Sequence, residues 1–192
     1  MPTRTLSTPS SSLPTSRTDS PDGAVVIRSP RIGDGALMWR LAVDSEVLDV
    51  NSSYAYLLWC RDYRATSVVA EVDDAIAGFV TGYLRPEAPE VLFIWQVAVD
   101  ESFRGRGIGV KMLDHLVCNA AEHGISTLET TVSPDNEASQ AMFASLARRH
   151  GAEMNREQLF RPDDFPGGHE SEDLYRISPL HNSDDHTTED KR

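Results

Sequence analysis

The sequence predicts an α/β protein built on one mixed, twisted sheet of six or seven strands with helices on both faces. Two observations favour this α+β type of mixed sheet. Strand-like and helix-like segments follow one another in the order β-α-α-β-β-β-α-β-α-β-β. The segment 91–99 is apolar except for Gln96, which is typical of a strand buried at the centre of such a sheet.

The first half of the chain predicts two helices and a hairpin after a short strand. We expect, in order, a strand at 25–28, helices at about 34–43 and 54–63, and strands at 66–72 and 76–84. Pro30 closes the first strand, and Asp34 can cap the first helix. The pair Asp73-Asp74 suits the hairpin turn. Residues 85–89 are expected to form a loop before the central strand.

The second half of the chain predicts alternating strands and helices that end in a pair of strands. We expect a strand at 91–99, a helix at 110–121, a strand at 127–132, a helix at 137–149, and strands at 154–160 and 174–178. Gly124 suits the position just after a helix. The segment 133–136 is rich in turn residues, and a Pro/Gly/Asp-rich loop is expected at 161–173.

Composition divides the 192 residues into one domain and two tails. Residues 1–22 contain fifteen Ser, Thr or Pro and few large apolar groups, so they are expected to be disordered. They lack the apolar stretch of a signal peptide. The domain is expected at 23–180, and 181–192 form a polar tail. No run of eighteen apolar residues predicts a membrane span.

The net charge indicates which kind of partner the chain binds, and the cysteines indicate the redox compartment. The formal net charge is −12, which argues against nucleic acid and suits a cationic substrate, although acidity also aids solubility. Cys60 and Cys118 both lie in apolar helical patterns. We expect them to be buried free thiols in a reduced cytosol, rather than a disulfide or a catalytic thiol.

The turn at 104–109 predicts a binding site for a pyrophosphate. Glycines let the backbone approach an anion, and the first turn of the following helix offers free N–H groups. The dinucleotide fingerprint would need Gly or Ala at Val110, and the phosphate-binding P-loop would need Ser or Thr after its Lys, where Met112 follows Lys111. An ordinary βα turn with two surface arginines remains the alternative.

The spacing of Arg104, Gly107 and Gly109 resembles the acyl-coenzyme A signature of the GNAT superfamily of N-acetyltransferases. The element order over residues 24–180 is also that of the GNAT fold. The coenzyme-binding residues that the resemblance implies are Val97, Ala98, Val99, Arg104, Gly105, Arg106, Gly107, Ile108, Gly109, Asn136 and Phe143. Asn136 is also a possible helix cap, and the two roles can coexist.

The chain departs from the common GNAT pattern at two catalytic positions. Many relatives have a Tyr at the position of Phe143, where it serves as the acid for the leaving thiolate, but Phe has no proton to donate. Many relatives also have a Glu in the fourth strand, and 91–99 contains none. Acid and base must therefore come from water or from two other polar segments, 49–54 and 167–173. A plain capped helix start and a solvated acidic loop are the respective alternatives.

Four longer motifs, 48–58, 93–99, 130–136 and 167–176, resemble the L-2,4-diaminobutyrate acetyltransferases of ectoine biosynthesis. The resemblance implies transfer of acetyl from acetyl-CoA to the γ-amine of L-2,4-diaminobutyrate, giving N4-acetyl-L-2,4-diaminobutyrate. It further implies a cytoplasmic homodimer that uses no metal and binds neither nucleic acid nor membrane. The substrate is a small amino acid with a net positive charge, which agrees with the acidity of the chain.

Substrate and catalytic roles follow from these motifs as predictions. Asp49 and Glu172 are expected to hold ammonium groups by charge-assisted hydrogen bonds. The remaining substrate-binding residues are expected to be Asn51, Ser53, Tyr54 and Trp95, with Trp95 as a wall of the acceptor slot. Glu172 or His169 is the expected base, and Tyr54 is a possible acid. A GNAT enzyme for another small amine, such as a polyamine or an aminoglycoside, and a non-catalytic acyl-CoA sensor remain alternatives.

Overall fold

The computed structural model describes residues 23–45, 48–121, 123–166, 168 and 170–180. The two expected tails and His169 lie outside the described residues. Four helices and seven strands follow one another in the predicted order, and their bounds differ from the predicted ones by up to three residues. The helices are α1 (Gly35–Asp44), α2 (Ser53–Asp62), α3 (Ile108–Ala121) and α4 (Glu137–Arg149). None of the helices in the described residues has the length and apolar character needed to span a bilayer.

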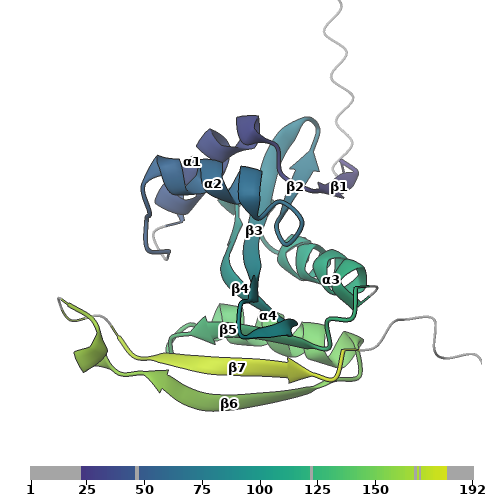
Figure 1. Cartoon of the computed structure of the whole chain (residues 1–192). Helices are drawn as coiled ribbons and strands as arrows, with labels where there is room; N and C mark the ends of the chain where they lie inside the picture. The colour runs from purple at the N-terminus through teal and green to yellow at the C-terminus, as the bar shows by residue number, and fades with distance from the viewer. Residues whose placement is uncertain (1–22, 46–47, 122, 167, 169, 181–192) are drawn as a thin grey trace, which may run out of the picture.

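The seven strands form one mixed sheet, which confirms the predicted fold class (Figure 1). They are β1 (Val25–Arg28), β2 (Val68–Val72), β3 (Ala75–Arg85), β4 (Ala88–Val99), β5 (Thr127–Val132), β6 (Glu153–Phe160) and β7 (Glu172–Ser178). Their order in the sheet is β1-β2-β3-β4-β5-β7-β6. Only the β4–β5 pair is parallel among the described strand pairs.

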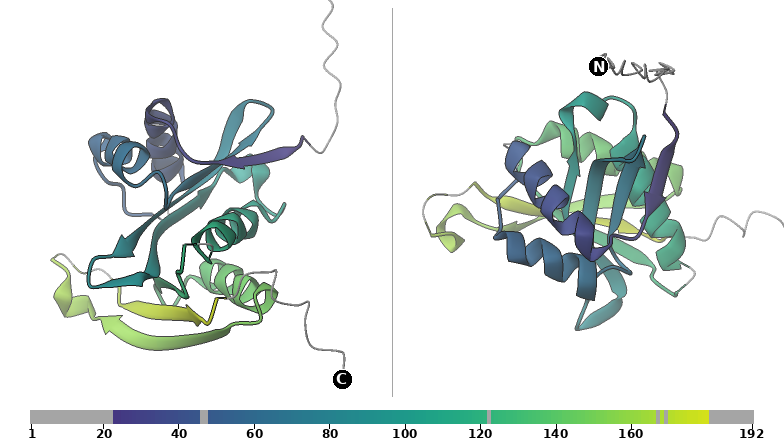
Figure 2. Two further views of the ribbon diagram at one scale, coloured as in Figure 1. Left: turned by 45° about the vertical axis from the view of Figure 1, so that its right-hand side comes forward. Right: turned by 90° about the horizontal axis from the view of Figure 1, so that it is seen from above.

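Helices cover both faces of the sheet (Figure 2), and a hydrophobic cluster lies between each helix layer and the strands. The larger one joins α3 and α4 to the strands through fully buried side chains such as Met112, Leu113, Leu128 and Leu146. The smaller one packs α1 and α2 against the other face of β2–β4. The sheet therefore has α3 and α4 on one face and α1 and α2 on the other, and β4 contributes to both clusters.

Three local predictions need correction. Residues 85–89 are not a loop: a two-residue turn at Pro86-Glu87 joins β3 directly to β4. Pro89 lies in β4 where the register shifts from Arg85↔Ala88 to Leu84↔Leu92, and it has no Cα partner on β3. Pro is tolerated at such irregular positions of a sheet. Cys118 is half-buried, unlike the buried Cys60.

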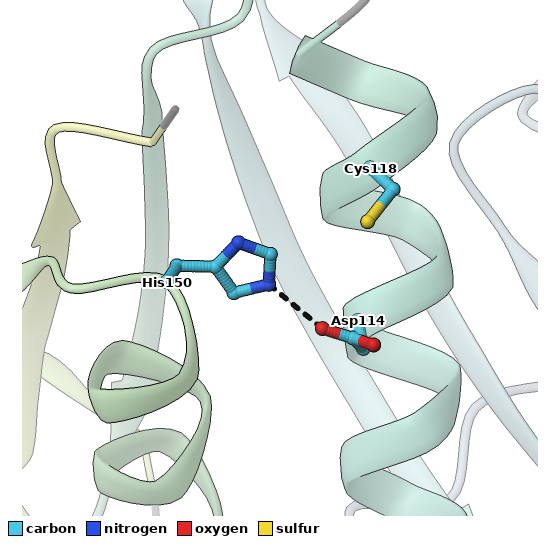
Figure 3. A group of neighbouring side chains, drawn as sticks. All are labelled: Asp114, Cys118 and His150. Carbon is cyan, nitrogen blue, oxygen red and sulfur yellow. Dashed lines mark hydrogen bonds and ion pairs between the residues drawn. The ribbon is translucent and has the colours of Figure 1, made fainter. Parts of the chain in front are cut away.

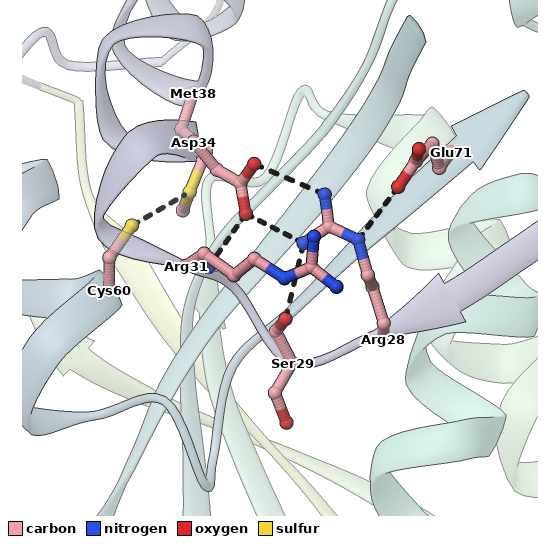
Figure 4. Close-up of polar contacts among 7 residues, drawn as sticks. All are labelled: Arg28, Ser29, Arg31, Asp34, Met38, Cys60 and Glu71. Carbon is pink, nitrogen blue, oxygen red and sulfur yellow. Dashed lines mark hydrogen bonds and ion pairs between the residues drawn. The ribbon is translucent and has the colours of Figure 1, made fainter. Parts of the chain in front are cut away.

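Asp34 precedes α1 as predicted, but its carboxylate does not cap that helix. It accepts hydrogen bonds from the Arg31 backbone N–H at 2.6 Å and from Arg28 Nη1 at 2.7 Å (Figure 4). Arg28 Nε also donates to Glu71 at 2.7 Å. The Asp34 carboxylate therefore belongs to a partly buried ion-pair network that ties β1 and β2 to the start of α1, and it does not cap the helix.

Candidate active site

A β-bulge in β4 shapes the centre of the candidate site. Thr81 pairs with Gln96 and Gly82 pairs with Ile94, so Trp95 is an extra residue on β4. The bulge interrupts the alternation of side chains, because Trp95 and Gln96 both face α2. The Trp95 ring lies 4.9 Å from that of Trp59, and the Gln96 amide accepts a hydrogen bond from Tyr56.

Gly82 permits this bulge. A Cβ atom at Gly82 would lie 2.8 Å from the backbone oxygen of Phe93 and 3.0 Å from that of Thr66. Neither oxygen belongs to a flexible side chain, so any larger residue would push β3 away from β4.

The parallel strands β4 and β5 separate just beyond the bulge. Their pairing runs from Val91↔Thr127 to Ile94↔Thr130, and the later residues of β4 have no described partner on β5. The backbone groups of β4 that face this gap are free to bind a ligand. A cavity of about 1520 Å³ opens there, lined from α2, the first half of α4, the five strands β3 to β7 and the loops around them.

The cavity lining contains six of the predicted site residues, namely Asp49, Trp95, Val97, Asn136, Phe143 and Glu172. Asp49 comes from the loop before α2, and its backbone oxygen accepts a hydrogen bond from Gln96 Nε2 at 2.9 Å. Asn136 caps α4, since its side-chain oxygen accepts from the Ser139 backbone N–H at 3.0 Å, and it also lines the cavity. The two roles weighed for Asn136 are thus compatible.

The cavity is acidic. The carboxylates in its lining are those of Asp49, Glu129, Asp135, Glu137, Glu170 and Glu172. Arg85 is the one Lys or Arg among the described lining residues. The hydrogen bond that the Ser133 hydroxyl donates, with a smaller contribution from the contact with Glu170, lowers the pKa of Asp135, so this carboxylate stays ionised at neutral pH. The resulting field favours a ligand with a net positive charge.

Glu129 and Arg85 form a functional group that the sequence did not reveal. The Glu129 side chain is 3% exposed, and it accepts hydrogen bonds from Arg85 Nη1 and Arg176 Nε, each at 2.9 Å. Two guanidinium groups thus share one buried carboxylate, and Arg176 also lies 3.7 Å from the Glu157 carboxylate. The only sequence signal was a Glu inside an otherwise uncharged strand, and its partners come from strands distant in the chain.

Several residues of the predicted acceptor segment lie outside the cavity lining. The Tyr54 side chain is 64% exposed on the outer face of α2, and Ser53 is the first residue of that helix. Asn51 is directed to the Asp49 backbone oxygen at 3.3 Å and to Tyr56. Tyr56 is the buried phenol of this region; burial raises its pKa, although the hydrogen bonds with Gln96 and Asn51 oppose that shift.

The predicted coenzyme turn has the backbone of an anion site. Gly105 and Gly107 adopt positive φ angles of 77° and 71°, which an L side chain rarely adopts. The turn leads into α3 at Ile108, whose first N–H groups have no partner within the helix. Successive N–H groups at left-handed residues form a concave site for anions. These features fit a pyrophosphate, as the sequence predicts.

Three residues of the predicted coenzyme set are engaged with the protein itself. Arg106 reaches the Gly23 backbone oxygen at 3.4 Å and lies 5.6 Å from the Phe103 ring centre, so it packs against the start of β1. Arg104 Nε donates to the Val99 backbone oxygen at 3.3 Å, and both residues line a smaller cavity of about 410 Å³. The Ala98 side chain is buried against α1 and α2.

Comparisons with known proteins agree on one family. The acetyltransferase (GNAT) family matches residues 36–147. L-2,4-diaminobutyric acid acetyltransferase from Nocardia farcinica is 56% identical over 158 residues, covering 82% of each chain. The enzyme of the same name from Streptomyces coelicolor is 56% identical over 157 residues, covering 80% of this chain and 92% of that one.

A solved structure also resembles this chain over most of its length. It is the diaminobutyrate acetyltransferase EctA from Paenibacillus lautus, in complex with its substrate L-2,4-diaminobutyric acid and coenzyme A. The two superimpose with a TM-score of 0.79 and are 39% identical, over 82% of this chain and 96% of that one.

Proposed function

The chain belongs to the L-2,4-diaminobutyrate acetyltransferases of the GNAT family, and from that premise we propose that it acetylates the γ-amine of L-2,4-diaminobutyrate with acetyl-CoA. The product is N4-acetyl-L-2,4-diaminobutyrate, an intermediate of ectoine biosynthesis. One observation carries the proposal: the acidic cavity opens where β4 leaves β5, with the anion-binding turn at the end of the same β4 strand.

The charges around the cavity suit each group of the substrate. Diaminobutyrate carries two ammonium groups and one carboxylate at neutral pH. We assign the ammonium groups to Asp49 and Glu172, which line the cavity. Arg85 is assigned to the carboxylate, because it is the one Lys or Arg among the described lining residues and its side chain is 41% exposed. Trp95 forms the aromatic wall between these charges, and its ring can also face a cation.

The chain's own residues must remove a proton from the attacking amine. An alkylammonium with a pKa of about 10 is not a nucleophile at neutral pH. Glu172, on the cavity wall at the start of β7, is our proposed base. His169, the other candidate, lies outside the described residues. Tyr54 was the predicted acid for the leaving thiolate, but it lies outside the cavity lining. We propose that water in the open cavity, rather than this phenol, protonates the thiolate.

Acetyl-CoA, when bound, supplies the acetyl thioester. The residues that fit it are the turn at 104–109 with the start of α3 for the pyrophosphate, and Val97, Asn136 and Phe143 along the cavity. The β4 backbone beyond the bulge is free to donate hydrogen bonds to a carbonyl oxygen there. The sequence prediction of acetyl-CoA as co-substrate agrees with the family.

We also propose that the enzyme acts in the cytoplasm as a homodimer, without nucleic acid or membrane. The support for a dimer is β6, an edge strand on which Leu159 and Phe160 are about 40% exposed beside the cavity. Light scattering after size-exclusion chromatography tests this point. A monomeric mass at assay concentration would contradict it.

Thiol release from acetyl-CoA tests the main proposal, with the position of acetylation in the product determined by NMR. We expect turnover with diaminobutyrate and acetylation at the γ-nitrogen. Turnover with spermidine but not with diaminobutyrate would favour an enzyme for another amine. Tight binding of acetyl-CoA without turnover on any amine would favour an acyl-CoA sensor.

A further inference from the structure

Three metal-ligating side chains converge where α3 meets the end of α4 (Figure 3). Asp114 and Cys118 are four residues apart on α3, so they share one face of the helix. His150 follows the last residue of α4. The carboxylate oxygen, the thiol sulfur and the ring nitrogen all lie within 4.8 Å of one another.

The imidazole is already held in position. The His150 side chain is 6% exposed, and Nε2 lies 2.8 Å from Asp114 Oδ1. The His150 backbone N–H donates to the Leu146 oxygen at 3.2 Å, which fixes the end of the helix. A side chain that is already fixed by packing and by its backbone loses little conformational entropy when it binds a metal ion.

We propose that Asp114, Cys118 and His150 bind a zinc-class divalent cation that clips α3 to α4. Thiolate, imidazole and carboxylate are the ligand types that Zn²⁺ prefers, in a tetrahedron with bonds of about 2.0–2.3 Å. Such bonds require ligand nitrogen and oxygen atoms about 3.3 Å apart, so Asp114 and His150 need to separate by a few tenths of an ångström.

The fourth ligand position faces solvent. The Asp114 side chain is 34% exposed, so water can complete the tetrahedron. Arg149 Nη1 lies 3.8 Å from the second Asp114 oxygen and is 55% exposed, so it can swing away at small cost. The metal replaces the thiol proton, and the site therefore binds more tightly as pH rises.

The site is structural rather than catalytic. None of its three residues lines either of the two cavities. The metal ion would join α3 to α4. The first turn of α3 follows the glycine turn at 104–109, and the first turn of α4 follows Asn136, so both helices begin at residues proposed to bind the coenzyme. The metal therefore stabilises the folded chain, because it binds the assembled helices and not the separated ones.

Titration of the full chain, first freed of metal by a chelator, tests this inference. With zinc sulfate alone, we expect one ion bound per chain and a melting temperature that rises with zinc concentration. With cobalt chloride alone, we expect a thiolate-to-cobalt charge-transfer band. Cys118→Ser is expected to abolish the band and weaken zinc binding at least tenfold.

Two further variants separate the site from general effects. His150→Gln tests the buried ligand, and circular dichroism verifies that each variant folds. His115→Gln is the matched control, because His115 lies beside Asp114 on α3 but outside the group, and it should bind zinc as the unchanged chain does. Zinc binding that is unchanged in both Cys118→Ser and His150→Gln, or a cobalt complex without a thiolate band, would overturn the proposal.

Discussion

Tyr56 donates a hydrogen bond from its phenol to Gln96 Oε1 at 3.0 Å, across the boundary between α2 and the bulged strand β4. The same amide then donates from Nε2 to the Asp49 backbone oxygen at 2.9 Å. Tyr56 and Gln96 are almost fully buried. These two contacts fix the position of the loop before α2, which contains Asp49, relative to β4.

Replacing Tyr56 with Phe should loosen that loop. The buried Gln96 oxygen would lose its donor, which costs about 1–3 kcal/mol of unfolding free energy. We expect the KM for diaminobutyrate to rise more than the KM for acetyl-CoA, because Asp49 belongs to the acceptor side. Urea denaturation and steady-state kinetics measure the two effects. Tyr54→Phe is the control: its phenol is exposed, so stability and KM should stay near their original values. Equal effects of the two variants would contradict the prediction.

Arg85→Met tests the proposed carboxylate contact through the choice of substrate. A charge-assisted hydrogen bond is worth about 1.5–3 kcal/mol, so kcat/KM for diaminobutyrate should fall about 10- to 100-fold. 1,3-Diaminopropane is the same substrate without its carboxylate, and its kcat/KM should change little. A selective loss of this kind separates contact with the substrate from general damage to the site.

Arg176→Met provides the control for Arg85. Arg176 binds the same Glu129 carboxylate, also at 2.9 Å, but lies outside the cavity lining. Its loss should affect stability without changing the preference for diaminobutyrate over 1,3-diaminopropane. If Arg85→Met lowers kcat/KM equally for both amines, Arg85 serves to hold Glu129 and does not bind the carboxylate.

A methyl group at Gly109 should disturb the packing of α3 against α4. A Cβ atom there would lie 2.7 Å from Met142 Sδ. Overpacking of this kind costs about 1–3 kcal/mol, although Ala is otherwise favoured over Gly in a helix by about 1 kcal/mol. We expect Gly109→Ala to lower the melting temperature and raise the KM for acetyl-CoA. In a Met142→Ala background the same change should be neutral or stabilising. A stabilising effect with Met142 present would show that this side chain moves aside freely.

The order of elements was predictable because each one carries its own periodicity. The segment 91–99 is nearly continuous in apolar residues, and Asp73-Asp74 marks the turn between β2 and β3 by composition alone. Both residues of that turn adopt positive φ angles, of 50° and 63°. Contacts between distant strands were not predictable in this way. Glu129 on β5 meets Arg176 on the neighbouring strand β7, and Arg85 reaches it from the end of β3, across β4. Periodicity along one strand does not reveal these contacts.

The positions of Tyr54 and Tyr56 show a second limit of prediction from sequence: Tyr54 is exposed and Tyr56 is buried. Residues two apart on a helix point about 200° away from each other, so one of the two phenols must face solvent. Both residues have apolar neighbours in the sequence. Tyr54 was predicted as a site residue because it belongs to the polar segment 49–54 before the helix. The bulge at Trp95 makes Tyr56 the buried phenol, because it turns Gln96 toward α2 and so gives the Tyr56 hydroxyl a hydrogen-bond partner. A bulge of one residue cannot be recognised in a strand whose residues are almost all apolar, because no alternation is there to be interrupted.

Asp34→Asn should change how stability depends on pH. Burial alone would raise the pKa of Asp34, but the hydrogen bonds from Arg28 and the Arg31 backbone outweigh it, so the pKa is lowered on folding. A lowered pKa contributes stability that is present above the unfolded-state pKa, near 4, and is lost as pH falls through the folded-state value. We expect Asp34→Asn to cost about 1–3 kcal/mol at pH 7 and progressively less toward pH 3.

Urea denaturation at a series of pH values measures this difference. The two stability curves should converge in acid, because protonated Asp34 no longer pairs with Arg28. Asp62→Asn is the control: Asp62 pairs with the neighbouring Arg61 on the exposed surface of α2, and its loss should shift the curve little. Parallel curves for Asp34→Asn and the unchanged chain would mean that the ionised carboxylate contributes no stability. The network that joins β1, β2 and α1 would then depend on packing rather than on charge.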